Sequence, residues 1–496
     1  MLASACAVAL ACAIACARAS GEPEDREPRR PAAPAVAPAK SDRPPTAAGS
    51  AAAASRAPPN AGPPTSATDP ATADSSILTT AGHRPPTAHR PPSTAHRPPS
   101  TAARQPPAPP KSGAGASACL GDPPSDPPPW VIGYWVSRRR NPYTPEKIQW
   151  RALTHLAVGP VEPRADGSID VSSLVDEPAA PESAPHPDAT RTPRSPRVPD
   201  GADDLVARAH AAGVKALLFV GGGATHDAFA AAATDETRAA FVAALVRWAR
   251  DEHGFDGLDL DWEPMRRADH DDFRSLARDL REAWPDVVLT VPVVHHNVNL
   301  DAVDPYWAKV AALFDRINVM SYGMAGEYPG WLSWHASALH GAAHDSPTSI
   351  ADSVEAYIAA GVPAAKLGIG IGFYGVCYTP PVAGPREELR GGWIAAADVD
   401  MSYRNIITRY FEAEAWRWDD EAKSPYLSFA EPKGPMGCGY ISYEDPRSIA
   451  ERAAYVKAQG LGGAIVWSIE QGYLPRAAEG ERDPLMDALA ACFLGR

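Results

Sequence analysis

The chain has 496 residues and a net charge of −13 at pH 7, and 22% of its residues are charged. This length suffices for one large domain with additional segments, or for two or three ordinary domains. Residues 1–127 hold 12 of the 47 Lys and Arg and 9 of the 60 Asp and Glu, so the remainder carries a net charge of −16. An acidic domain without a basic run argues against nucleic acid or an anionic membrane as its partner, whereas a neutral polymer would not be repelled.

The first 19 residues are interpreted as an export signal. The stretch MLASACAVALACAIACARA is apolar and shorter than the ~20 residues of a membrane span. No Lys or Arg precedes it, which is atypical, but small residues precede Cys12 and Cys16 as in a bacterial lipoprotein signal. We therefore expect a protein that is either secreted or a cell-surface lipoprotein, with membrane contact only through an N-terminal lipid anchor.

Residues 20–127 are predicted to be a disordered Pro/Ala-rich linker. Residues 21–130 hold 27 of the 54 prolines, and a short repeat (HRPPTA, HRPPSTA, HRPPSTAA) runs from His83 to Ala103. Such a segment has too few large apolar residues to bury a core, and it should form an extended, partly polyproline spacer. A Pro-rich ligand for a partner domain is less favoured, because the repeat has no clear PxxP pattern.

The remaining cysteines indicate two disulfides. If the N-terminal cysteines are removed with the signal, or if Cys16 is lipidated, Cys119, Cys377, Cys438 and Cys492 remain, and four cysteines allow three pairings. Cys119 and Cys492 bracket the folded domain, and the other two bracket an insertion. We favour the pairs Cys119–Cys492 and Cys377–Cys438, with four buried free thiols as the alternative.

From residue 128 onward, eight short apolar runs alternate with Ala-rich segments of helical period. The runs lie at 130–136, 152–161, 214–223, 255–264, 287–294, 315–323, 366–375 and 462–470. Consecutive runs are separated by enough residues for a crossover helix, and this spacing is typical of a parallel sheet. We predict an α/β fold, a TIM (β/α)8 barrel over residues 128–496, in preference to an open doubly wound sheet.

Two details refine this prediction. Some eighty residues separate the seventh and eighth strands, which predicts a small α+β insertion between strands 7 and 8 at about residues 377–440. The glycines at 221–223 lack both GxGxxG and GxxxxGK[ST], so we predict no nucleotide cofactor.

The run FDGLDLDWEP carries three acids that alternate with apolar residues. On a strand, Asp259, Asp261 and Glu263 would share one face, and the two leucines and the tryptophan between them the other. The lumen of a barrel is normally filled by branched apolar side chains, and burying unpaired carboxylates is costly. These acids therefore indicate a functional site rather than the solvated face of a surface strand.

The spacing of the acids indicates their chemistry. Glu263 lies furthest along the strand, where barrel enzymes place their active sites, and Asp261 lies about 6–7 Å behind it at ~3.3 Å per residue. Two such carboxyls should share a proton, which raises the pKa of one of them, as a general acid requires; Asp259 can orient Asp261 or accept its proton. In ordinary glycosidases a second carboxylate lies across the sugar from the acid, whereas two acids on one strand approach from the same side. If these acids cleave a glycosidic bond, the nucleophile must therefore come from elsewhere, and an N-acetyl group of the substrate can supply it.

These residues resemble a known family. Asp256, Asp259, Asp261 and Glu263 reproduce the DxxDxDxE signature of glycoside hydrolase family 18, the chitinases and related enzymes. The resemblance extends over most of residues 130–475: MSYG at 320–323 is similar to the MxYD of that family, FYG at 373–375 to its YGR, and LGGAIVWSIEQGY to its closing segment.

The resemblance implies roles for individual residues. Glu263 would protonate the glycosidic oxygen, Asp261 would orient the acetamido group and stabilise an oxazolinium-like intermediate, and Asp259 would support Asp261. Tyr322 would bind the acetamido group, and Trp467 would form the floor under the sugar. The further substrate-binding residues are Met320, Tyr374 and Tyr134.

The chain also departs from the family pattern. Gly323 stands where the family has an acid after the tyrosine, and FVGGG lacks the serine that usually precedes the glycines. Gly372 and Val376 replace a proline and an arginine of the family.

Other aromatic and imidazole residues are less informative. Trp135, Trp331, Trp334 and Trp393 are either sugar-stacking platforms or core residues, and the sequence alone leaves this open. His295 and His296 would point to opposite sides of a strand, so we predict no metal site and no cofactor.

We therefore expect a monomeric glycosidase that cleaves β-1,4-linked N-acetylglucosamine polymers such as chitin, with retention by substrate-assisted catalysis. The partner would be a polysaccharide or oligosaccharide. The alternatives are an endo-β-N-acetylglucosaminidase acting on glycans or peptidoglycan, and a non-catalytic sugar-binding relative. Relatives of the last kind typically lose the terminal Glu, which this chain keeps as Glu263.

Overall fold

The computed structural model describes residues 119, 128–137, 142–174, 201–297, 302–343, 345–346 and 348–496. The export signal predicted at 1–19 and the linker predicted at 20–127, apart from Cys119, lie outside the described residues.

Eight parallel strands form a closed barrel. They follow one another around the ring in the order β1, β2, β4, β5, β6, β7, β8 and β14, and the pairing of β14 with β1 closes it. Their bounds are β1 Trp130–Val136, β2 His155–Pro163, β4 Lys215–Gly222, β5 Gly257–Trp262, β6 Val288–Val294, β7 Arg316–Met320, β8 Leu367–Gly372 and β14 Gly463–Trp467. The predicted TIM barrel is confirmed, and each predicted run overlaps one of these strands.

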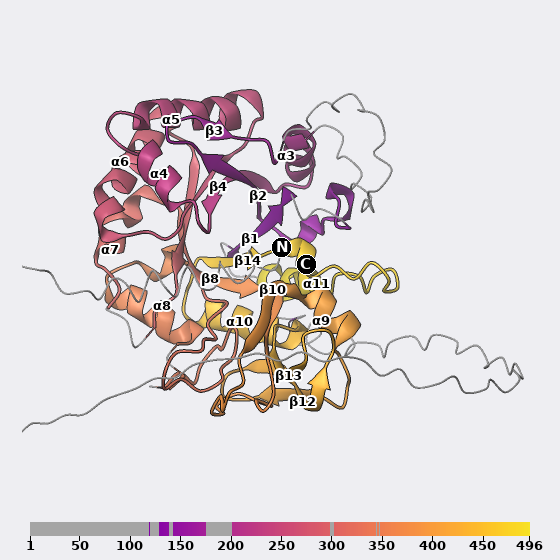
Figure 1. Ribbon diagram of the computed structural model, residues 1–496. Coiled ribbons are helices and arrows are strands. Elements are labelled where there is room, and N and C mark those ends of the chain that lie inside the picture. Colours follow the sequence, from indigo (N-terminus) through magenta and orange to yellow (C-terminus); the bar gives the residue numbers. More distant parts are fainter. Residues whose placement is uncertain are drawn as a thin grey trace, which may run out of the picture. The chain divides into compact units, whose positions relative to one another are not determined.

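Helices lie outside the ring of strands (Figure 1). They are α3 Gly201–Ala211, α4 His226–Ala232, α5 Arg238–Val246, α6 His270–Ala283, α7 Tyr306–Val310, α8 Ile350–Ala359, α10 Pro446–Ala458 and α11 Pro484–Leu494. A short strand β3 (Ile169–Asp170) pairs antiparallel with the end of β2. Among the described residues, no helix combines the length and apolar character needed to cross a membrane.

The alternation on β5 divides its side chains between two layers. Leu258, Leu260 and Trp262 are buried in the large core between strands and helices, where Trp262 stacks on Phe229 of α4 at 5.1 Å between ring centroids. A smaller apolar cluster fills the barrel lumen, with Ile132, Tyr134, Ala157, Leu217, Phe219, Val288 and Ile465 as its buried members. Because neighbouring residues on a strand face opposite sides, Asp259 and Asp261 point into the lumen.

The sequence between β8 and β14 forms a second, antiparallel sheet. Its strands are β9 Tyr374–Tyr378, β10 Ile394–Ser402, β11 Trp416–Asp419, β12 Ser424–Lys433 and β13 Cys438–Ser442, in the spatial order β10-β9-β13-β12-β11. Helix α9 (Tyr403–Arg409) follows β10, and α10 returns the chain to the barrel. Figure 1 shows β10, β12 and β13 grouped with α9 and α10.

Both predicted disulfides are confirmed. Cys377 of β9 is bonded to Cys438 of β13 within the second sheet. Cys119 is bonded to Cys492 of α11, so the start of the folded part is joined covalently to its last helix.

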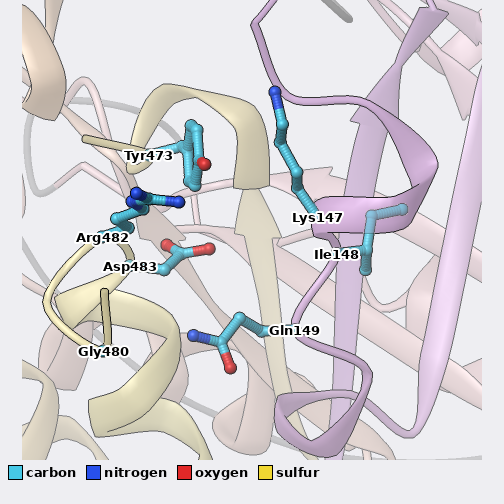
Figure 2. Close-up of a pocket in the computed structure, with 7 residues that line it drawn as sticks. All are labelled: Lys147, Ile148, Gln149, Tyr473, Gly480, Arg482 and Asp483. Atoms are coloured by element: carbon cyan, nitrogen blue, oxygen red, sulfur yellow. The ribbon is translucent and has the colours of Figure 1, made fainter. Parts of the chain in front are cut away.

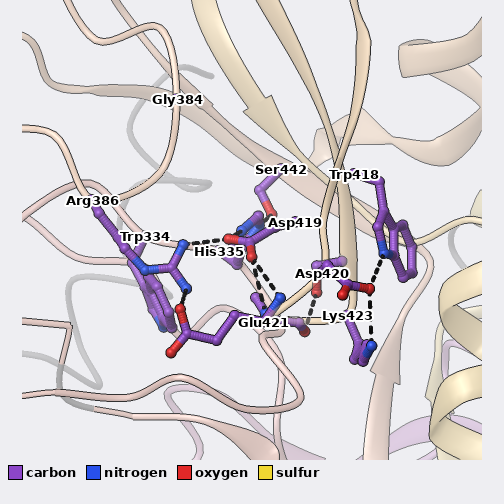
Figure 3. Close-up of polar contacts among 12 residues, drawn as sticks. Trp334, His335, Gly384, Arg386, Trp418, Asp419, Asp420, Glu421, Lys423 and Ser442 are labelled. Atoms are coloured by element: carbon purple, nitrogen blue, oxygen red, sulfur yellow. Dashed lines mark hydrogen bonds and ion pairs between the residues drawn. The ribbon is translucent and has the colours of Figure 1, made fainter.

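A polar network centred on the buried side chains of His335 and Asp419 holds the loop after β7 against the second sheet (Figure 3). His335 Nε2 lies 3.0 Å from Asp419 Oδ2, and Arg386 donates to Asp419 and, at 3.0 Å, to Glu421. Burial opposes ionisation of Asp419, but the hydrogen bond and charge of His335 and the bond from Arg386 lower the pKa of Asp419 overall. The network therefore stabilises the packing of loop against sheet.

The same network links a serine, a histidine and an aspartate in the order in which serine hydrolases link their catalytic residues. Ser442 Oγ lies 3.2 Å from His335 Nδ1, on the side of the ring opposite Asp419. Ser442 is only 1% exposed, and its oxygen accepts the backbone N–H of Ala336 at 3.0 Å. A substrate has no access to this hydroxyl, so the arrangement is structural.

Candidate active site

The three predicted acids follow one another from the middle of β5 to just beyond its carboxyl end. Asp259 and Asp261 are buried, and Glu263, which follows the strand directly, is half-buried. Asp261 and Glu263 share a side-chain hydrogen bond. The structure thus places the acids at the end of the barrel where TIM-barrel enzymes carry out their chemistry.

The environment of Asp261 favours its protonated form. Burial, followed by the charge of Glu263, the hydrogen bond to Glu263 and the charge of Asp259, raises the pKa of Asp261 well above its ordinary value. Its Oδ1 has no hydrogen-bond partner among the described residues. Burying a hydrogen-bond acceptor without a donor costs free energy of folding. In Asp261 this acceptor, Oδ1, belongs to the same carboxyl group that shares a proton with Glu263.

Asp259 is held by two hydroxyl groups. Tyr134 of β1 donates to Oδ2 at 2.6 Å, and Thr290 of β6 donates to Oδ1. Burial raises the pKa of Asp259, and the two hydrogen bonds lower it. The effect of burial is larger, so the pKa is raised to about 6. Asp259 is therefore ionised at neutral pH, and its charge helps to retain the proton on Asp261.

The glycines at the end of β4 make room for Asp261. Gly221 and Gly222 have φ values of +99° and +109°, which favour glycine. A Cβ on Gly221 would collide with the backbone oxygen of Asp261 and with the ring of Phe229. The run FVGGG thus allows β4 to pass close to β5 at the site.

Aromatic rings form the wall and floor beside the acids. Tyr134 lies 5.2 Å from Phe219 and 5.5 Å from Trp467, and Phe219 lies 5.9 Å from Trp467, all between ring centroids in edge-on contacts. Trp467 is the last residue of β14 and is partly exposed. A partly exposed aromatic face at this position can stack against a sugar ring.

Two tyrosines extend the site on its other side. Tyr322, two residues beyond β7, packs with Met320 in the lumen cluster, and its ring meets that of Tyr374 edge-on at 6.0 Å. Burial, and then the proximity of Tyr374 and Asp261, raises the pKa of the Tyr322 phenol well above its usual range. Its hydroxyl therefore stays protonated and can donate a hydrogen bond beside the acids.

All eight predicted site residues thus lie around one end of the lumen. Sequence reasoning missed Thr290 and Phe219. Thr290 is the only polar residue of β6, and a polar residue inside an otherwise apolar strand could have been taken as a signal.

The four tryptophans left open by the sequence divide into two groups. Trp135 and Trp334 are buried, and their indole N–H groups donate to the carbonyls of Tyr143 at 3.3 Å and of Thr348 at 2.8 Å. They belong to the core. Trp331 is half-buried and Trp393 is 53% exposed, so these two remain accessible to a ligand.

The histidines of the described part of the chain form no metal-binding cluster. His295 Nδ1 lies 3.2 Å from the carbonyl oxygen of Met320, which requires the proton on that nitrogen. Across the described ranges, no group of three or more His, Cys, Asp or Glu side chains is arranged to hold a metal ion.

A cavity of about 260 Å³ has none of the three acids in its lining (Figure 2). It is lined by Lys147, Ile148, Gln149, Tyr473, Gly480, Arg482 and Asp483, none of which is a predicted site residue. Asp483 accepts a hydrogen bond from the Tyr143 hydroxyl at 2.7 Å. This contact joins the β1–β2 connection to the start of α11.

Comparison with known proteins identifies relatives. The sequence model of the family described as glycosyl hydrolases family 18 matches residues 131–472. Chitinase A1 of Niallia circulans is 30% identical over 295 residues, which span 52% of this chain and 40% of that protein. The class V chitinase of Arabidopsis thaliana is 31% identical over 283 residues, 53% of this chain and 72% of that protein.

The structural comparison agrees with the sequence comparison in fold. The group IV chitinase of Ostrinia furnacalis, solved in complex with allosamidin, superposes with a TM-score of 0.58 at 21% identity, over 73% of this chain and 97% of that one. The chain spans about half the length of several curated relatives, 53% of an endochitinase of Manduca sexta and 58% of a mouse chitotriosidase.

Proposed function

The chain belongs to the family 18 glycosyl hydrolases, and we propose that it hydrolyses β-1,4 linkages in N-acetylglucosamine polymers such as chitin, with retention of configuration. The observation that supports this proposal most directly is the pair Asp261–Glu263: a shared hydrogen bond, a raised pKa and an unpartnered oxygen, Oδ1 of Asp261, beside it. No second carboxylate is needed across the sugar if the acetamido group of the substrate attacks.

The first half of the reaction uses the shared proton. The shared proton passes from Asp261 to Glu263, which transfers it to the glycosidic oxygen. At the same time the acetamido carbonyl oxygen attacks the anomeric carbon, and the bond from that carbon to the departing sugar breaks. Asp261 is left as a carboxylate, and its Oδ1 can accept the N–H of the positively charged oxazolinium ring. This contact stabilises charge that appears only during the reaction, which is how an enzyme lowers a barrier.

The second half returns the proton. The Glu263 carboxylate removes a proton from water, the resulting hydroxide bonds to the anomeric carbon, and the bond to the acetamido oxygen breaks. Two inversions at the same carbon give net retention. Tyr322 would donate to the acetamido oxygen during the attack, and Trp467 would support the ring at the cleaved position.

We further propose that the protein is exported and acts on a polysaccharide or oligosaccharide outside the cytoplasm. The two disulfides support this, because such bonds persist in oxidising compartments. A proteomic search for a chain that begins after residue 19, or at a lipidated Cys12 or Cys16, tests the export proposal.

The activity is tested by hydrolysis of a fluorogenic N-acetylglucosamine oligomer by the wild type and by Glu263→Gln. We expect near-total loss of turnover in the variant with binding of the oligomer retained, because the amide cannot donate the proton but keeps its shape. Equal turnover by both proteins rejects the mechanism. Activity confined to an N-glycan or to peptidoglycan changes the substrate to that of an endo-β-N-acetylglucosaminidase.

A further inference from the structure

The lumen-facing side of β8 consists of glycine alone. Leu367, Ile369 and Ile371 are buried in the outer core, so the alternate residues Gly368, Gly370 and Gly372 face inward. Each leaves a space that a neighbouring side chain occupies: Asn318 lies over the first, the ring of Tyr322 over the second and the ring of Tyr374 over the third.

The Tyr322 ring and the backbone of Ser321 occupy the space at Gly370. A Cβ atom on Gly370 would lie 2.8 Å from Cδ1 and Cε1 of Tyr322, and 2.8 Å from the backbone nitrogen of Ser321. Carbon atoms in contact are normally about 3.5–4.0 Å apart. A side chain at position 370 therefore forces the Tyr322 ring or its backbone to move.

Ser321 fixes the backbone just ahead of Tyr322. The backbone pairing of β7 with β8 ends at Val319 and Ile369. Beyond it the Ser321 side chain replaces the ladder, since its Oγ donates to the Gly370 carbonyl at 3.1 Å and accepts the Gly370 N–H at 2.9 Å. Ser321 is fully buried, so water does not compete for these two bonds.

A third bond holds the same residue from the opposite direction. Ser337 Oγ, in the loop after β7, donates to the Ser321 carbonyl at 2.9 Å. The backbone before Tyr322 is thus fixed to β8 on one side and to that loop on the other, which fixes the point from which the Tyr322 side chain extends.

We propose that Ser321 and Gly370 are positioning residues that hold Tyr322 beside the Asp261–Glu263 pair, and this inference rests on the function proposed above. The distance between the Tyr322 hydroxyl and the acetamido oxygen matters most in the transition state, when that oxygen attacks. Ser321 supplies the hydrogen bonds, and Gly370 supplies the space.

The first test is a pair of variants on β8. Gly370→Ala should lower kcat about tenfold to a hundredfold, because a displacement of about 1 Å in a catalytic group has effects of this size. Ile371→Val, on the next residue and the opposite face of the strand, should leave kcat unchanged while lowering the Tm slightly. Ser321→Ala should lower kcat about tenfold, since two of the three bonds are lost.

A double-mutant cycle distinguishes positioning from general destabilisation. In a Tyr322→Phe background the hydroxyl is absent, so Gly370→Ala and Ser321→Ala should each change kcat by less than about twofold. Losses in kcat that persist at full size in this background, or that follow the Tm of each variant including Ile371→Val, overturn the proposal.

A crystal structure of Gly370→Ala gives an answer that does not depend on activity. The proposal requires the Tyr322 ring to be displaced relative to the wild type, and an unmoved ring refutes it. If the wild type fails to hydrolyse N-acetylglucosamine oligomers, the proposed function fails, while the displacement in this crystal structure still decides whether Gly370 positions Tyr322.

Discussion

Asp259 shows how single residues set the chemistry of the site. Burial raises its pKa to about 6, while the hydroxyls of Thr290 and Tyr134 hydrogen-bond the ionised form and lower it. Above pH 6 the charge of Asp259 favours the protonated form of Asp261, and in the proposed mechanism it would add negative potential near the cationic intermediate. Below pH 6 protonation removes that charge, and we expect the rate to fall.

The first prediction concerns Thr290. Thr290→Val removes one hydrogen bond to the ionised form, so the pKa of Asp259 should rise further, and the acidic limb of kcat/KM against pH should move to higher pH. Thr290→Ser keeps the hydroxyl and should keep the limb in place. A pH–rate profile of Thr290→Val that coincides with the wild type would show that this hydrogen bond does not control the proton.

The residues of the site were predictable only in part. The spacing of Asp259, Asp261 and Glu263 along one strand is visible in the sequence, and so is their common face. Thr290 lies directly opposite Asp259 in the parallel ladder of β5 and β6, and that pairing depends on the register set by closure of the whole barrel. No local pattern in the sequence gives that register.

At the scale of the element, the end of β4 is built around glycine. Gly221→Ala adds backbone strain at φ +99° and a collision with Asp261 and Phe229. Gly213→Ala is a matched control, because Gly213 has φ +71° and no atom within 4 Å of the added Cβ. We predict that urea denaturation gives a loss of about 1–2 kcal/mol for Gly213→Ala and of about 3 kcal/mol or more for Gly221→Ala.

This comparison also has an activity readout. Gly221→Ala should lower kcat because it moves the backbone of Asp261, and Gly213→Ala should not. Equal losses of stability in both variants would mean that backbone strain alone makes glycine necessary at 221.

A buried histidine, His155, lies at the amino-terminal end of the barrel. There His155 stacks on Trp130 at 4.0 Å, and Arg316 covers the same tryptophan at 4.0 Å. Burial, and then the charges of Lys215 and Arg316, lowers the pKa of His155 to about 3. The folded protein thus resists binding a proton that the unfolded chain takes up near pH 6.5.

The unfolded state binds more protons between pH 6.5 and 3, so this residue contributes stability above pH 6.5 that is lost as the pH falls, by about 3–5 kcal/mol at pH 3. His155→Phe keeps the stacking without the titration. We predict a shallower loss of unfolding free energy with falling pH in this variant, and parallel curves for both proteins would contradict the account.

The elements themselves were largely predictable, because each barrel strand is an apolar run between helical segments. The run at 366–375 is the instructive exception, since the structure divides it between β8 of the barrel and β9 of the second sheet. The Phe373 N–H, one residue beyond the end of β8, still donates to the Trp467 carbonyl of the barrel at 2.8 Å. Both parts are apolar and strand-forming, so the pattern does not show where one sheet ends.

At the scale of the whole molecule, two covalent links join distant parts of the sequence. Cys377 and Cys438 are 61 residues apart, and Cys119 and Cys492 are 373 apart.

Removal of the Cys377–Cys438 disulfide by Cys377→Ala with Cys438→Ala should lower the free energy of unfolding by about 4 kcal/mol, because the unfolded chain gains the conformational freedom of a loop of that length. Calorimetry should show the lower Tm, while turnover at 25 °C stays close to wild type since neither cysteine lies at the site. Unchanged Tm would mean that packing alone holds the second sheet.

The pairing of the cysteines was predictable from their positions around the domain and around the insertion. The export signal and the linker stay predictions, because they lie outside the described residues.

In the proposed mechanism one carboxyl group, Glu263, serves as acid and base while the substrate provides the nucleophile. The most direct measurement is proton NMR of the first anomer released from an N-acetylglucosamine oligomer by the wild-type protein, recorded before mutarotation. We expect the β-anomer, formed through two inversions at one carbon. Release of the α-anomer would require water to attack directly with a base on the far side of the sugar, and would contradict the mechanism.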